Sequence, residues 1–126
     1  MNERNMMNEM KKELTDRKRI TIAFRELRKA GYFCRRSWSC CRSCGITEIP
    51  KKNQKKFLFY CSQSNSLFDG AYLGSQGLWW TWYGNGHEIA RAFEHAGFKV
   101  EWDGTEENTI RILGTKNLKE TGLLLR

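Results

Sequence analysis

Two segments of this sequence repeat the same order of signals: an amphipathic helical stretch, the pair Ala-Gly, an aromatic residue and an alternating stretch. The first helical stretch ends at Gly31 and the second at Gly97. Glycine adopts the left-handed backbone conformation that closes a helix at little steric cost, so each glycine predicts a helix end. The pattern fits two independent helix ends or a duplicated helix–strand unit.

The first helix is predicted from about Asp16 to Ala30. Its apolar positions fall at i, i+3, i+4 and i+7, which places one stripe on one face. The stripe consists of Ile20, Ala23, Phe24 and Leu27. The second helix is predicted to begin after the N-cap Asn85, with Glu88 reaching back to the N–H group of Asn85.

Alternating or apolar runs predict strands over 32–38, 57–61 and 78–83, and a hairpin that joins 98–102 to 110–112. A further short element is expected at 71–73. A chain of 126 residues is typical of one domain. The sequence therefore predicts a single small α+β domain over 15–126, mainly an antiparallel sheet with two main helices packed on one face. Residues 1–14 are expected to form a flexible or weakly helical lead, and the role of 114–126 stays open.

Five cysteines, an odd number, occur without a secretory signal, which disfavours a disulfide framework and favours a reducing cytoplasm. Cys41 and Cys44, followed by Gly45, have the spacing of a zinc knuckle. The predicted metal ligands are Cys41, Cys44, Cys61 and Cys40, with His87 as a further candidate.

Two alternatives compete with zinc. Cysteines often pack as small buried hydrophobes. A redox Cys-x-x-Cys pair normally begins a helix. Gly45, Ile46, Thr47 and Pro50 argue against a helix there, and residues 46–49 are expected to be extended.

The formal net charge of +8 is unevenly distributed, because residues 1–56 carry 16 basic and 6 acidic side chains. Such asymmetry is typical of a chain that binds an acidic macromolecule, either nucleic acid or an acidic protein, and equally of a solvated face. No apolar run is long enough to cross a membrane. The predicted partner-binding residues are Arg17, Lys18, Arg28, Lys29, Arg35, Arg36, Arg42, Lys51, Lys52, Lys55, Lys56 and Trp79.

The order of motifs resembles a family of small bacterial domains of unknown function over about residues 20–113. The resemblance rests on a Cys-Cys-x-x-Cys-Gly turn at 40–45, Phe59-Tyr60, Gly84 and Gly86, and the hairpin residues 102–104. The chain departs from that family at Cys61, where the family has histidine, another zinc ligand. The resemblance implies domain limits and no established activity.

We therefore expect a non-enzymatic binding module with a basic face, stabilised by zinc, in a bacterial or phage-like cytoplasm. The sequence shows no readable catalytic set. The first alternative is a small protein-binding inhibitor or immunity-type regulator that uses exposed aromatic residues. The second is a thiol-dependent enzyme that uses the cysteine cluster.

Overall fold

The computed structural model describes residues 14–105 and 109–115. Helix α2 (Asp16–Lys29) begins at Thr15, whose side chain accepts a hydrogen bond from the N–H group of Lys18. Gly31, at φ +96°, closes it. Helix α4 (Gly86–His95) begins at Asn85 and is followed by Gly97, at φ +102°. Both helices lie where the sequence predicts them.

The cap of α4 differs in one respect from the expectation. The Asn85 side chain accepts from the N–H groups of His87 and Glu88, as an N-cap should. Its own N–H group donates to the Tyr32 hydroxyl, at 2.9 Å, rather than to Glu88. The prediction that the Glu88 side chain accepts a hydrogen bond from the N–H group of Asn85 was wrong, because the hydroxyl of the buried Tyr32, which precedes β1, accepts it instead.

The main sheet has five strands in the order β1-β2-β5-β7-β6. They are β1 (Phe33–Arg35), β2 (Phe57–Phe59), β5 (Leu78–Tyr83), β6 (Lys99–Glu101) and β7 (Ile110–Leu113). A small second sheet pairs β3 (Phe68–Asp69) with β4 (Tyr72–Leu73). Two 3-10 turns, η1 (Lys51–Asn53) and η2 (Ser62–Leu67), flank β2. The α+β class is confirmed, with a central β5 that is apolar on both faces.

One pair of strands in this sheet is parallel. Strands β1 and β2 run in the same direction, whereas the pairs β2–β5, β5–β7 and β6–β7 are antiparallel. The parallel pair requires a long crossover. Residues 36–56 provide it, and they carry the cysteine turn.

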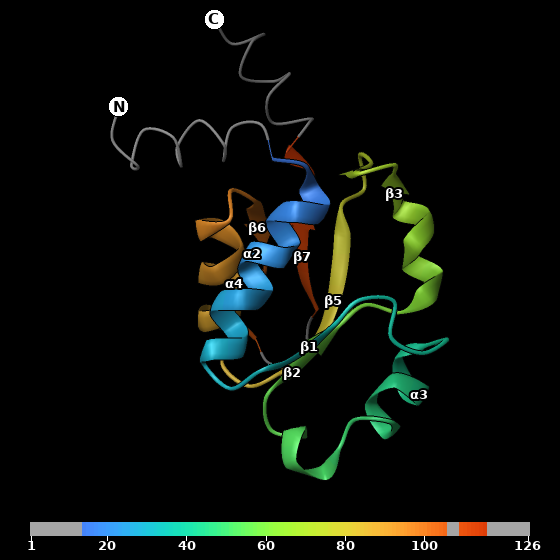
Figure 1. The fold of residues 1–126 in the computed structure, drawn as a ribbon, viewed down its shortest axis with the longest axis vertical. Coiled ribbons are helices and arrows are strands. Elements are labelled where there is room, and N and C mark those ends of the chain that lie inside the picture. Colours follow the sequence, from blue (N-terminus) through green and yellow to red (C-terminus); the bar gives the residue numbers. More distant parts are fainter. Residues whose placement is uncertain (1–13, 106–108, 116–126) are drawn as a thin grey trace, which may run out of the picture.

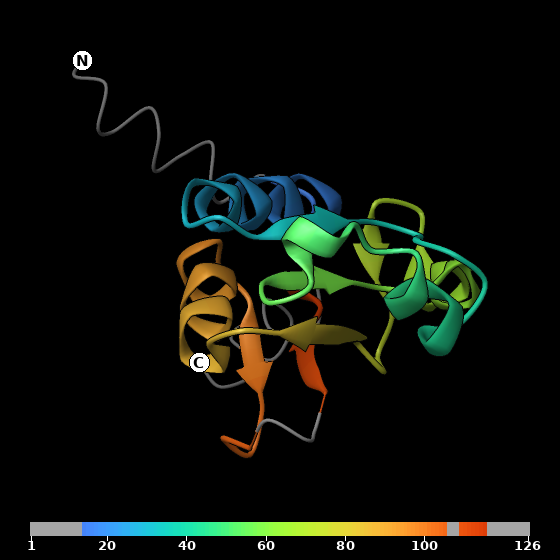
Figure 2. The same cartoon turned by 90° about the horizontal axis from the view of Figure 1, so that it is seen from below.

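Helices α2 and α4 pack side by side on one face of the sheet (Figures 1 and 2). Alternate strand residues, including Leu58 and Trp80, join their apolar stripes in the main core. Phe57 and Phe59 point to the opposite face, where they form a smaller core with Ile49. The crossover therefore sits on the face that the two main helices leave uncovered. No helix in the described ranges is long and apolar enough to span a bilayer.

Candidate metal centre

The cysteine turn is attached to the end of β2 by two backbone hydrogen bonds. The N–H group of Trp38 donates to Tyr60 O at 2.8 Å, and that of Ser62 donates to Ser39 O at 3.0 Å. Ser37 and Ser39 adopt φ values of +46° and +65°, which reverse the chain after β1. These contacts hold the turn in one place before the first metal candidate, Cys40.

Helix α3 (Arg42–Thr47) follows directly, so the prediction of an extended stretch over 46–49 was wrong. Cys41 is its extended N-cap residue, and Gly45 N donates to Cys41 O at 2.9 Å. Gly, Ile and Thr favour helices weakly, but tertiary contacts override such preferences. Here the Trp38 indole N–H donates to Gly45 O at 2.9 Å.

Gly45 is required at its position by the ring beneath it. A Cβ atom there would lie 2.6 Å from two carbons of the Phe59 ring, closer than non-bonded carbons approach. The absence of a side chain therefore lets the first turn of α3 rest on the sheet. This contact sets the position of Cys44, which precedes Gly45.

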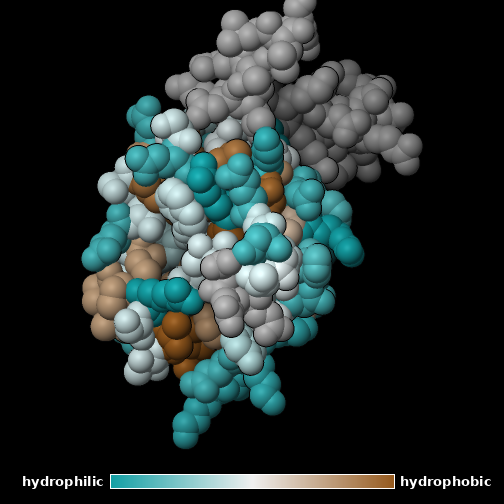
Figure 3. Space-filling view, turned by 180° about the vertical axis from the view of Figure 1, so that it is seen from behind, coloured by the Kyte–Doolittle hydropathy of each residue, from teal (hydrophilic) through white to brown (hydrophobic). Residues whose placement is uncertain are grey.

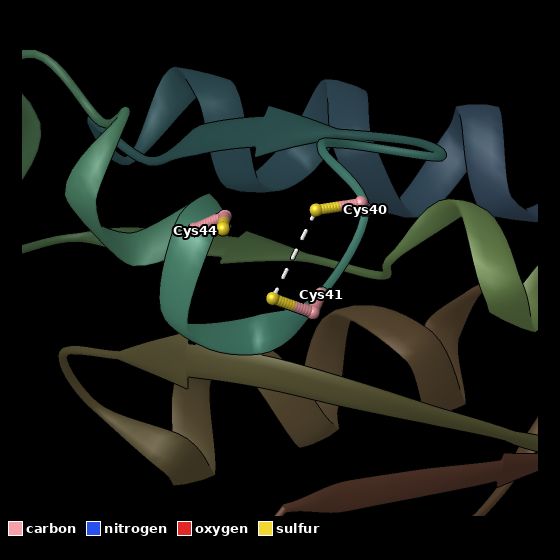
Figure 4. A group of neighbouring side chains, drawn as sticks. All are labelled: Cys40, Cys41 and Cys44. Carbon is pink, nitrogen blue, oxygen red and sulfur yellow. Dashed lines mark hydrogen bonds between the residues drawn. The ribbon is translucent and has the colours of Figure 1, made fainter.

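The thiols of Cys40, Cys41 and Cys44 form a cluster in which all three sulfurs lie within 4.8 Å of one another. Figure 4 shows the three side chains converging from the turn and from the first turn of α3. The Cys40 thiol donates to the Cys41 sulfur at 3.9 Å. Cys40 and Cys44 are exposed, and Cys41 is half-buried. Three thiolates at this spacing can hold a metal ion.

The cluster also shifts the acidities of its members. The Cys44 N–H and thiol, close to the Cys41 sulfur, lower the pKa of Cys41. The same contact and the Cys40 thiol raise the pKa of Cys44 to about 11. Of these two thiols, Cys41 therefore loses its proton more readily, and a thiolate is the form that binds metal.

A shallow depression of about 390 Å³ adjoins the cluster. Cys40, Cys44 and Glu48 line it together with three hydroxyl side chains, those of Ser39, Ser43 and Thr47. Glu48 and Thr47 were not predicted from the sequence as residues of the site. They lie near the cluster only because residues 42–47 are helical, and Glu48 follows Cys44 by four residues.

The other predicted ligands lie outside this cluster. Cys61 is half-buried between the two hydrogen bonds that tie 60–62 to 38–39, and burial, then the nearby Cys41 and Cys40, raise its pKa. His87 lies against the Trp102 ring, with ring centroids 5.0 Å apart. Cys34 is fully buried in the main core, and burial raises its pKa to about 12. Packing as a small hydrophobe thus describes Cys34 and not the two exposed cysteines.

Five of the predicted partner-binding residues hold the fold together. Arg17, Arg28, Arg35, Arg36 and Lys56 each donate to a backbone carbonyl oxygen, at 2.8–3.1 Å. All five also lie over aromatic rings at 4.0–5.3 Å, and Arg36 donates to the Thr21 hydroxyl. A guanidinium that fixes a loop in this way is less available to an external partner.

The remaining basic candidates lie at the surface. Within the described residues, no hydrogen bond or ion pair holds their charged groups, and their side chains are exposed. They are Lys18 and Lys29 on α2, Arg42 on α3, and Lys51, Lys52 and Lys55 around η1. Figure 3 shows hydrophilic side chains projecting at the bottom of the view from behind, where the η1 loop lies.

Trp79 is on the sheet face opposite α2 and α4 and is 39% exposed, whereas Trp80 and Trp82 are buried. The guanidinium of Arg111 lies 5.0 Å from its ring centroid. Tyr83 is 58% exposed on the same strand face and stacks on Phe57. In Figure 3, apolar side chains gather at the lower left, in the region of α3.

No curated protein and no solved structure matches this chain. A family model does match, over residues 2–117, which is more of the chain than the 20–113 expected from the motifs. The turn and the hairpin on which the resemblance rested remain expectations about that family. By this match, the chain belongs to the family described as Domain of unknown function (DUF6891).

Proposed function

We propose that this chain is a non-enzymatic binding module that carries one thiolate-bound Zn²⁺ ion in a reducing cytoplasm. One observation carries the proposal: the mutual approach of the Cys40, Cys41 and Cys44 sulfurs within 4.8 Å. Zinc–sulfur bonds of about 2.3 Å in a tetrahedron place neighbouring sulfurs about 3.8 Å apart. The Cys40–Cys41 pair already lies at 3.9 Å, so binding requires small side-chain adjustments.

Cys61 is the proposed fourth ligand. Its backbone neighbours are tied to residues 38 and 39, which places Cys61 beside the turn that carries Cys40. The effect of Cys40 and Cys41 on its pKa supports this proximity. A structural zinc site normally has four protein ligands, and a rotation of the Cys61 side chain would complete the set.

Metal analysis of the full chain, purified without chelators, tests the site. We expect about one zinc per chain, and a content below about 0.2 would contradict the proposal. Cys41→Ser and Cys44→Ser should each abolish stoichiometric zinc. Cys61→Ser should weaken binding by about 10–100-fold. Cys34→Ala is the matched control, since it removes a thiol from the core and should retain zinc.

The proposed partner is an acidic macromolecule, with nucleic acid as the first version. Six exposed basic side chains, which make no hydrogen bond within the part of the chain that the structure describes, support it: Lys18, Lys29, Arg42, Lys51, Lys52 and Lys55. If they contact phosphates, affinity for a duplex or single-stranded oligonucleotide should fall by about 10³-fold between 50 and 200 mM salt. Binding that is flat over this range, or absent, would contradict this version.

Matched variants separate the two groups of basic residues. Replacing Lys51, Lys52 and Lys55 together with glutamine should weaken oligonucleotide binding and leave stability nearly unchanged. Arg36→Gln should instead lower stability, because its guanidinium bonds Arg17 O and Thr21. Equal loss of binding in both variants, with stability intact, would contradict the division.

The alternative is a protein-binding regulator. The exposure of Trp79 and Tyr83 on the sheet face opposite the main helices favours it. Tryptophan and tyrosine are common anchors of protein interfaces. A partner that co-purifies after nuclease treatment, and is lost in Trp79→Ala, would support this alternative over nucleic acid.

A further inference from the structure

The cysteine cluster is also arranged for thiol chemistry. The sequence disfavoured a redox pair because no helix was expected to begin at residues 41–44, but α3 begins there, at Arg42. We propose that the reduced, metal-free cluster exchanges with small disulfides, with Cys41 as the attacking thiol and Cys44 as the resolving thiol. This activity goes beyond the proposed function and uses the same thiols without depending on the metal.

The spacing of the pair favours closure of a disulfide. Cys41 is the extended residue before α3, and Cys44 lies in the first turn, with their sulfurs within 4.8 Å. Rotation of the two side chains can bring the sulfurs to the bonding distance of about 2.05 Å. Cys40 and Cys41 are adjacent, and a bond between them would close a small ring around a planar trans peptide. Cys44 is therefore the favoured partner of Cys41.

The position of Cys41 favours it as the attacking sulfur. It precedes α3 in the Cys-x-x-Cys pair, and the Cys44 sulfur lies within 4.8 Å of it, so a mixed disulfide on Cys41 has a resolving thiol within reach. Cys34 cannot take part, because it is fully buried.

The surface beside the cluster has room for a small substrate. The depression of about 390 Å³ lined by Cys40 and Cys44 is open to solvent on the side of these exposed thiols. Its volume lies within the range of small-molecule pockets. A low-molecular-weight disulfide is the substrate class that matches both the space and the thiol chemistry.

The reaction balances in two displacements. The Cys41 thiolate attacks one sulfur of the substrate disulfide, a mixed disulfide forms, and the other half leaves as a thiolate that takes up a proton. The Cys44 thiolate then attacks the Cys41 sulfur and releases the second half in the same way. The two protein thiols are oxidised to one disulfide, and the substrate disulfide is reduced to two thiols.

The test uses the full chain, freed of metal with a chelator, reduced, and treated with glutathione disulfide at about 0.1 mM. Groups joined by a short stretch of chain experience about millimolar local concentrations, so resolution should exceed a second external attack by about tenfold. Intact mass and peptide mapping should show a Cys41–Cys44 disulfide and no retained glutathione. Cys44→Ala should instead accumulate glutathione on Cys41.

Two controls give the test its specificity. Cys34→Ala, which removes a buried thiol outside the cluster, should still form the Cys41–Cys44 disulfide, whereas Cys41→Ala should lose it. Wild-type protein that retains glutathione on Cys40 or Cys44, or that forms a Cys40–Cys41 disulfide, would overturn the proposal. So would a Cys41→Ala variant that consumes glutathione disulfide as fast as the wild type.

The metal analysis and this experiment fail independently. Stoichiometric zinc in the reduced chain without disulfide closure would refute the exchange activity and leave the zinc module intact. Disulfide closure in a chain that binds no zinc would refute the module and support exchange. Where both hold, zinc loading should slow the formation of the disulfide, because it occupies the attacking thiolate.

Discussion

Replacing Asp16 should destabilise the fold more than replacing any other carboxylate in the described part of the chain. Asp16 is fully buried at the first position of α2. Its carboxylate accepts from Leu73 N at 2.8 Å, Thr115 N at 3.1 Å and the Thr115 hydroxyl at 2.5 Å. One side chain thus joins the start of α2 to β4 and to the segment that follows β7.

The size of the effect follows from the donors left behind. In Asp16→Ala, two backbone N–H groups lose their acceptor, and each unsatisfied buried donor costs about 1–3 kcal/mol. The Thr115 hydroxyl can rotate to another partner and adds little. Water entering the vacated space recovers part of the loss, so we expect a decrease of about 2–4 kcal/mol in the free energy of unfolding.

Urea unfolding followed by tryptophan fluorescence measures this change. With an unchanged slope of about 1–3 kcal/mol per M, the midpoint should fall by roughly 1–3 M. Asp16→Asn should lose less, about 1–2 kcal/mol, because the amide oxygen still accepts from one side. Asp69→Asn, at an exposed position of β3, is the control and should change stability by less than about 0.5 kcal/mol.

A decrease below about 1 kcal/mol in Asp16→Ala would refute the reasoning, since it would mean that the two N–H groups find other acceptors. An equal loss in Asp16→Asn and Asp16→Ala would show that charge, and not the number of acceptors, determines the effect.

Three other changes test the fold around the site. Burial raises the pKa of Tyr32 and of Cys34 to about 12. The stability that comes from their neutral forms is therefore present below their unfolded pKa values of about 10 and 8.5, and it is lost as the pH rises toward 12. The free energy of unfolding measured at pH 8 and at pH 11 should show this loss, and Tyr32→Phe and Cys34→Ala should each make the difference between the two pH values smaller. Gly45→Ala should lower the free energy of unfolding by about 1–3 kcal/mol, because the added methyl group would clash with the Phe59 ring, and it should also weaken zinc binding. The control Ser43→Ala should leave stability nearly unchanged. Normal zinc affinity in Gly45→Ala would contradict the role of the contact between Gly45 and Phe59. The indole N–H of Trp80 is buried without an acceptor among the described residues, so Trp80→Phe should cost less than the roughly 3–5 kcal/mol of Trp80→Ala, as calorimetry can measure.

The basic residues show how far charge alone can be interpreted. Composition identifies a basic half of the chain but gives no information on how each guanidinium is used. Arg28 donates to Cys34 O, and Lys56 donates to Ala30 O. Arg28 joins α2 to the strand that follows it, whereas Lys56 joins the end of the crossover to the end of α2, and the sequence reveals neither contact. The structure therefore narrows the candidate contact surface to side chains without such bonds.

The sequence by itself determined the elements whose signals are local. The apolar stripe from Ile20 to Leu27 and the closing glycines Gly31 and Gly97 predicted both main helices, because helical periodicity and a left-handed closing residue act within a few residues. The run at 78–83, which is apolar on both faces, predicted the strand that lies at the centre of the sheet.

Only the tertiary structure decided the cysteine cluster. The local preferences of Gly45, Ile46 and Thr47 oppose a helix, yet α3 forms because the Phe59 ring and the Trp38 indole receive Gly45. The convergence of three sulfurs depends on that helix and on the crossover that makes β1 and β2 parallel. Contacts between residues distant in sequence outweigh a weak local preference, which is the physical reason why the spacing predicted ligands but not their geometry.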